Sequence, residues 1–209
     1  MKSLIKLTYA GILSLTALNA VALDVGGMKL GLGPKLSLNA NKASVGDAAK
    51  SEMGYSWGLG VVSQLDLDPV VLELGLQYSE RRFEYKDLLG IDGSYATTLK
   101  QFEIPFLTYY KFGISDTLAL RAGAGAQLEI GMGDVKGDAG SVSYSDAGIS
   151  KTAYSLLLDV GTDYKISELG SLAFDIRYAL GLNDRSDSNG LFSDKFKTQY
   201  IEVSAAFLF

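Results

Sequence analysis

Apolar and polar side chains alternate with a period of two along most of this sequence. Between Met28 and Leu38 every second residue is apolar, and the positions between them hold glycine, lysine and serine. This period is that of a β-strand with one apolar face. Eight such strands are predicted, and they cover residues 28–38, 54–61, 70–79, 101–112, 118–131, 154–165, 172–181 and 200–209.

The connections between the predicted strands alternate in length. Three are turns of four residues, at 66–69, 113–116 and 167–170. Alternating short and long connections predict antiparallel strands in chain order, with the long loops at one end and both termini at the other. The long connections are polar and rich in Gly, Ser and Asp, and they comprise residues 39–52, 86–97, 133–151 and 183–197.

Glycine distinguishes the two all-β folds that such alternation allows, a soluble β-sandwich and a barrel. Gly58, Gly75 and Gly123 occupy the same face of the strands as the charged residues. Glycine weakens a strand at a solvated surface, whereas inside a narrow barrel it leaves room for long charged side chains. The pattern favours an eight-stranded antiparallel up-and-down transmembrane β-barrel, with its apolar face toward lipid and its first strand paired with its last. A soluble periplasmic β-sandwich that acts as a binding module is the alternative left open.

Aromatic residues on the apolar face form two groups. If the long loops are outside the cell, one group lies near the loops and the other near the short turns. Such girdles are expected where a barrel crosses the two membrane interfaces. The loop-side group is Tyr55, Trp57, Tyr78, Phe102, Tyr154 and Tyr178, and the turn-side group is Tyr110, Phe112, Tyr164, Phe207 and Phe209.

The first residues have the organisation of a cleaved secretory signal. Two lysines precede an apolar run at 7–18, which is shorter than the roughly 20 residues of a membrane-spanning helix. Small residues then suit cleavage between Ala22 and Leu23. The sequence thus predicts a signal peptide at 1–22 and one outer-membrane β-barrel domain at 23–209, located in the cell outer membrane of a Gram-negative bacterium.

The fourth predicted strand carries a motif. Residues 102–112 read FEIPFLTYYKF, and this stretch resembles one in PorT-type outer-membrane β-barrel proteins, which are eight-stranded and similar in shape to OmpA/OmpX-type barrels. The opening at 27–32 and the terminal Phe209 resemble the first strand and the closing signature of such proteins. The resemblance implies insertion into outer-membrane lipid by the barrel assembly machinery, with Phe209 as the assembly signal. It implies no single activity.

Composition excludes several classes of function. The chain has no His and no Cys, so neither a Ser-His-Asp triad nor a His/Cys zinc site can form, and enzymatic outer-membrane barrels that use His are excluded. A formal charge of −5 argues against nucleic-acid binding. A paired-carboxylate hydrolase, with Glu103 and Glu129 as acid and base, would need a cleft that a filled eight-stranded lumen does not provide. We therefore expect no catalytic residue, cofactor or metal site.

Charged residues on the inward face are expected to plug the barrel. Charges taken out of water need partners, and the arginine fork suits carboxylates. We predict a network in which four glutamates surround Arg121 and Arg177. A proton or ion path is the alternative, because buried ionisable groups often mark function. The members of the predicted network are Glu73, Glu103, Arg121, Glu129, Asp159, Asp175, Arg177 and Glu202.

Together these features predict a non-enzymatic, monomeric outer-membrane barrel with a structural or adhesion-like role. Loops on a rigid scaffold are where binding residues concentrate, so an extracellular ligand is expected to contact the long loops at 39–52, 86–97, 133–151 and 183–197. A narrow porin-like channel for ions or small solutes is the alternative function.

Overall fold

The computed structural model describes most of the chain after the expected signal segment. Residues 1–22, including Ala22, lie outside the described part, so the signal peptide stays a prediction. No helix among the described residues is long and apolar enough to cross a membrane. The described ranges are 23–25, 28–45, 50–88, 91–137, 140–167, 170–186 and 196–209.

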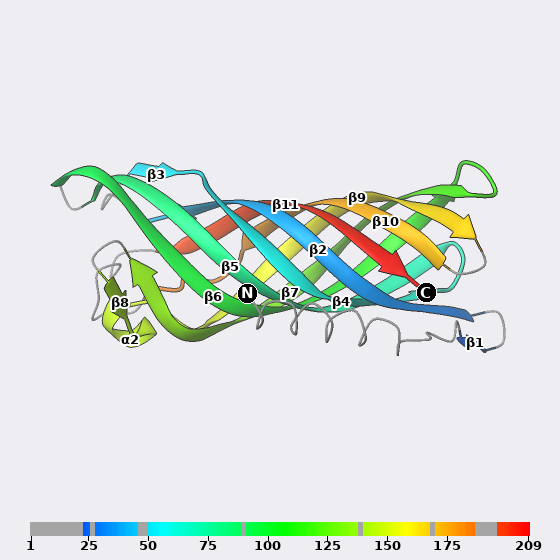
Figure 1. Ribbon diagram of the computed structural model, residues 1–209, viewed down its shortest axis with the longest axis horizontal. Coiled ribbons are helices and arrows are strands. Elements are labelled where there is room, and N and C mark those ends of the chain that lie inside the picture. Colours follow the sequence, from blue (N-terminus) through cyan, green and yellow to red (C-terminus); the bar gives the residue numbers. More distant parts are fainter. Residues whose placement is uncertain are drawn as a thin grey trace, which may run out of the picture.

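Eight long strands form a closed barrel in which each strand is antiparallel to both neighbours, and they run obliquely around its long axis (Figure 1). The first and last of them pair from Lys197 opposite Ser44 to Ala206 opposite Lys35. Closure leaves no strand edge in lipid. The predicted eight-stranded barrel is confirmed, and the soluble sandwich is wrong. The strands are β2 (Met28–Ser44), β4 (Gly54–Asp66), β5 (Val70–Leu88), β6 (Ile91–Gly113), β7 (Leu118–Gly137), β9 (Thr152–Ser167), β10 (Gly170–Gly181) and β11 (Lys197–Leu208).

Within the described ranges, four short elements supplement the barrel. Strand β1 (Leu23–Val25) pairs with β2, β3 (Lys50–Glu52) with β5, and β8 (Gly140–Val142) with β7, and helix α2 (Tyr144–Ala147) follows β8. Figure 1 shows β3, β8 and α2 at one end of the barrel, beside the hairpin of β5 and β6, and the C-terminus near the other end. We call these the loop end and the turn end.

Three of the expected long loops contain regular structure. The connection expected at 86–97 is a continuation of β5 and β6, which remain paired as far as Leu88 opposite Ile91. The connection at 39–52 contains the end of β2 and all of β3, and that at 133–151 contains the end of β7, β8 and α2. The loop assignment was wrong because it relied on polar composition, whereas these segments also carry apolar residues that are buried inside, among them Ala43, Val45 and Val135.

The two faces of the barrel wall have opposite character. Leu74 and Leu158 on the outside are each 53% exposed, whereas Glu73 and Asp159 on the inside are 2% and 3% exposed. Monomeric proteins in water rarely expose a continuous apolar surface of this extent. The outward face is therefore suited to lipid, as the alternation predicts.

Glycine on the inward face makes space for larger neighbours. A Cβ atom on Gly161 would overlap the carboxylate of Asp175 and lie 3.2 Å from Arg121 Nε. On β5, a Cβ atom on Gly75 would lie 2.9 Å from the ring of Pro105 on β6. These glycines admit the charged pair and the proline to a crowded interior.

Candidate functional site

Arg177 is the centre of one charged group in the lumen. Its side chain comes from β10 and is buried. Nε donates a hydrogen bond to Asp159 Oδ2 at 2.7 Å, and Nη2 donates to Glu73 Oε1 at 2.9 Å. Nη1 lies 3.5 Å from Glu202 Oε1, which also lies 2.8 Å from Lys35 Nζ. The guanidinium thus links carboxylates from three other strands.

Arg121 of β7 forms the neighbouring group, toward the turn end. Its Nη2 donates a hydrogen bond to Asp175 Oδ1 at 2.6 Å, and its Nη1 lies 3.2 Å from Asp163 Oδ1. Nη2 is also 3.9 Å from Glu73, so this carboxylate is shared between Arg121 and Arg177. The guanidinium lies 4.7 Å from the centre of the Tyr109 ring, within the range of a cation–π contact.

The predicted network assigned Glu103 to the wrong arginines. Arg81 holds Glu103 with two hydrogen bonds, of 2.8 Å from Nε and 2.7 Å from Nη2, and its guanidinium lies 3.5 Å over the ring of Tyr200. Glu103 pairs across the sheet with Glu129, which lies eight residues along β7 from Arg121. At the rise of a strand, that separation is about 26 Å, too far for contact.

Glu129 is held instead by Arg185, a residue that the sequence analysis did not select. Arg185 follows β10 and is 1% exposed. Its Nη1 lies 3.4 Å from Glu129 Oε2, and its Nε donates to the carbonyl of Ser150 at 3.1 Å. The segment was interpreted as part of a solvated loop. Arg185 nevertheless has the same odd-numbered parity as Arg177, which was the available signal that it continues the inward face.

The turn that carries Arg185 is fixed by Asp184. Its Oδ1 accepts hydrogen bonds from the amides of Ser186, at 3.0 Å, and Phe196, at 2.8 Å. Partial burial acts to raise the pKa of Asp184, but these hydrogen bonds outweigh it and hold the pKa below the usual value.

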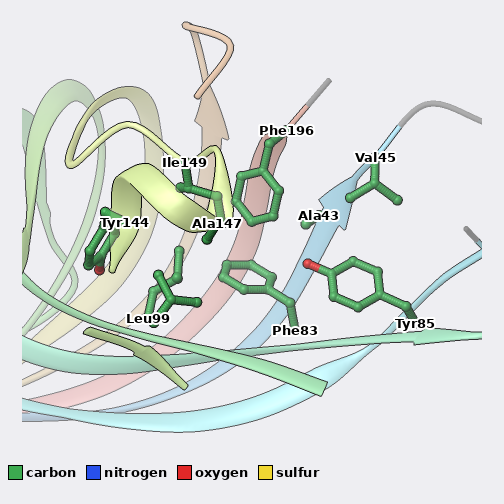
Figure 2. Packing of buried hydrophobic residues seen from close by; sticks show 10 residues of the cluster. Ala43, Val45, Phe83, Tyr85, Leu99, Tyr144, Ala147, Ile149 and Phe196 are labelled. Carbon is green, nitrogen blue, oxygen red and sulfur yellow. The ribbon is translucent and has the colours of Figure 1, made fainter. Parts of the chain in front are cut away.

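Above the charged groups, the loop end contains an apolar core that the sequence analysis missed. We call this cluster the apolar cap, and Figure 2 shows its side chains converging inside the barrel from several strands and from α2. The rings of Phe83 and Phe196 meet edge to face at 5.8 Å, and Tyr144 donates a hydrogen bond to the carbonyl of Lys100 at 3.0 Å. Its members are Ala43, Val45, Phe83, Tyr85, Leu99, Val135, Tyr144, Ala147, Ile149 and Phe196.

Around the apolar cap, the outward face of the same strands is polar. Arg82 Nε lies 2.8 Å from Glu84 on β5, and Lys100 Nζ on β6 lies 3.8 Å from Glu80. We call this part of the molecule the outer extension. It comprises residues 79–100 of β5 and β6 with β3, β8, α2 and the adjoining ends of β2, β7 and β11.

The aromatic residues expected in two girdles all belong to the outward face. On the loop side, the Trp57 ring lies 6.1 Å from Tyr78, whose ring is 6.2 Å from Phe102. Near the turn end, Tyr110 and Phe112 have ring centres 4.8 Å apart, as do Phe207 and Phe209. The remaining members, all exposed, are Tyr55, Tyr154, Tyr164 and Tyr178.

The turn end of the barrel is open, whereas the loop end is closed by the apolar cap. A vestibule of about 490 Å³ is lined there by residues that include Lys29, Asp66, Lys111 and Asp163. Lys111 Nζ donates a hydrogen bond to Asp66 Oδ2 at 2.6 Å. Within the described ranges, no group of three or more acidic side chains could hold a metal ion.

A family profile described as Outer membrane protein beta-barrel domain matches residues 25–187, which is most of the chain. This protein belongs to that family. Its members' location places it in the bacterial outer membrane, as the sequence predicts. The match supports the OmpA/OmpX-like resemblance at this coarser level, without the PorT-type label.

Solved structures of outer-membrane barrels share the fold of this family member. Neisserial surface protein A has 13% sequence identity and a TM-score of 0.50, over 85% of this chain and 97% of that one. The outer membrane protein OprG from Pseudomonas aeruginosa has 14% identity and a TM-score of 0.51, over 86% and 95% of the two chains. At such identities the likeness concerns the fold alone. A search among curated proteins gives no match.

Proposed function

We propose that this outer-membrane barrel is a non-enzymatic surface protein that presents its outer extension to an extracellular partner, in a structural or adhesion-like role. The observation that carries the proposal is the apolar cap. A buried core of aromatic and aliphatic side chains makes the outer extension a packed structure, and rigid scaffolds favour binding because less order is lost on association.

Burial of the lumen supports a surface role over the alternative of a narrow channel. Arg81, Glu103, Arg177 and Glu202 are each only 1% exposed to a water-sized probe. No water-sized space therefore lies against these side chains, and the apolar cap adds a second barrier toward the loop end. The vestibule at the turn end ends at the group around Arg121.

Burial also argues against catalysis by Glu103 and Glu129. Gln101 Nε2 donates hydrogen bonds to both carboxylates, at 3.0 and 3.1 Å, and arginines occupy their other sides. A substrate would have to displace these partners. We propose a structural role for the pair.

The narrower expectations from the sequence fit the same proposal. Cleavage between Ala22 and Leu23 would release the barrel domain, and Phe209 would be read by the barrel assembly machinery. The likeness of residues 102–112 to PorT-type barrels and the monomeric state belong to this proposal as well.

Conductance in planar bilayers tests the closed lumen. We expect the refolded full chain to give no stable openings at moderate voltage. Stable single-channel openings, lost when a bulky side chain is introduced by Ser37→Trp, would overturn the proposal in favour of the channel.

Cell attachment tests the surface role. Cells displaying the protein are expected to be retained on immobilised laminin or collagen more than cells without it. Replacing the exposed charges by Arg82→Ser and Glu84→Ser should reduce retention, while Leu158→Ala on the lipid face should not. Equal retention of cells with and without the protein on both matrices would count against an adhesive role.

A further inference from the structure

Basic residues of the outer extension differ in whether they have acidic partners. On β5 and β6, Lys100 lies near Glu80, and Lys86 Nζ lies 2.5 Å from Glu52. On the opposite seam, where β2 pairs with β11, Lys42 and Lys197 form no ion pair with any described residue. Among the described residues, these two positive charges therefore have no ion-pair partner.

Lys42 and Lys197 lie close together on the outward face. Lys42 is directly opposite Gln199, and Lys197 is opposite Ser44, one step further toward the loop end. The two lysines are thus diagonal neighbours, about 7–8 Å apart at the backbone. The charge of Asp184 interacts with that of Lys197, and this single carboxylate can offset at most one of the two positive charges.

The side chain between the lysines has a free donor. Tyr178 donates a hydrogen bond to Gln199 Oε1 at 3.0 Å, which leaves the amide NH₂ of Gln199 as a donor on the residue that pairs with Lys42 and lies two positions from Lys197. Two point charges and an amide donor are the chemistry that binds a phosphate oxygen.

The position along the barrel identifies the source of such a phosphate. Tyr178 belongs to the loop-side girdle, and the next pair below Lys42 is Ala40 with Tyr55, a girdle residue that is 72% exposed. Aromatic girdles mark the level of the lipid headgroups. The lysines lie immediately above that level, on the side that faces out of the cell in a barrel with short periplasmic turns.

We propose that Lys42, Lys197 and Gln199 bind a phosphate group of lipid A, the phosphorylated glycolipid of the outer leaflet. The acyl chains would lie along the apolar wall below, over Tyr55 and Ile201. The site would anchor this seam of the barrel to the outer leaflet.

Native mass spectrometry of the refolded full chain with bisphosphorylated lipid A tests the site. The double variant Lys42→Gln/Lys197→Gln is expected to bind roughly thirtyfold more weakly, the factor expected of two lysines at a lipid surface. The control Lys86→Gln/Lys100→Gln removes the same charge from paired positions and should change the affinity by less than about threefold. Heat-modifiable gel mobility verifies that all three proteins are folded.

Two further lipids define the source of the phosphate. Lipid A without phosphate groups should bind the wild type as weakly as bisphosphorylated lipid A binds the Lys42/Lys197 variant. Phosphatidylglycerol should bind the wild type more weakly than lipid A. The proposal is overturned if the double variant binds like the control, if phosphate removal has no effect, or if phosphatidylglycerol binds as well as lipid A.

Discussion

The same strands have opposite polarity in two regions of this barrel. On β6 at membrane level, Glu103 points inward and Phe102 outward, whereas in the outer extension Leu99 points inward and Lys100 outward. β5 and β6 stay in one antiparallel ladder through both regions, and the register between β6 and β7 shifts at Thr98–Lys100, where the two regions meet. The medium outside the wall therefore determines which face of each strand is apolar, and the interior has the opposite polarity.

The two interiors are consequently held together by different forces. Lipid is as apolar as a leucine side chain, so the membrane-level barrel gains little from the hydrophobic effect and relies on ion pairs and hydrogen bonds in its lumen. The outer extension is surrounded by water and can be stabilised by burying apolar area.

Removal of a lumen guanidinium should have the largest effect. Arg177→Met leaves Glu73, Asp159 and Glu202 without their shared partner, and breaking a buried pair costs about 3–5 kcal/mol. The matched change Arg82→Met breaks an exposed pair and should cost less than about 1 kcal/mol. Denaturant unfolding in phospholipid vesicles measures both. Equal losses would refute the view that the lumen is held by its ion pairs.

Truncation of leucine should affect the two regions in the reverse manner. Leu99→Ala opens a cavity in the apolar cap and should cost about 2–5 kcal/mol. Leu76→Ala, on the lipid face, leaves space that lipid chains fill and should cost less. Hydrogen exchange should show lost protection in the outer extension of the Leu99 variant, with heat-modifiable mobility retained. If both variants lost protection throughout the barrel, the two regions would not be separate in stability.

The inversion of polarity explains which features could be predicted from sequence. Period-two alternation and the glycine-rich polar face predict eight strands and a closed barrel, because one solvent applies along all of the membrane-level strands. The alternation also continues to Phe83 and Tyr85, which share odd-numbered parity with Glu73. When inward-facing positions change from charged to apolar along one strand, the sequence therefore indicates that the strand extends into water. The polar composition of these segments hid this change.

The partners within the lumen were harder to predict. Parity shows that Glu103 and Arg121 face inward, but contact also depends on height along the barrel, which the strand register determines. The position of the Arg185 side chain in the lumen depends in addition on a turn held by Asp184. The alternation of the sequence does not predict the register between β2 and β11, where the barrel closes. It does not predict the course of that turn either.

The cost of a charge on the outward face should depend on its depth in the membrane. Leu158 lies between the girdle residues Tyr154 and Tyr164 on β9, and Leu158→Arg is expected to cost about 2–4 kcal/mol, as for arginine near the bilayer midplane. Thr152→Arg, on the same face of the same strand but above the girdle, should cost less than about 1 kcal/mol. Unfolding free energies in vesicles compare them. A similar cost at both positions would place Thr152 within the hydrocarbon region.

Acid should loosen the outer extension by the smallest amount. The pKa of Asp184 is lowered in the folded state, so its contribution is present above the unfolded pKa of about 3.9 and is lost as the pH falls through the folded value. Because Asp184 is exposed and screened, we expect at most about 1 kcal/mol. Hydrogen exchange at Arg185 and Phe196 should therefore increase below about pH 4 in the wild type. Asp184→Asn keeps the accepting oxygen but cannot titrate, so it should remove this pH dependence, and a persistent dependence would assign the titration to another carboxylate.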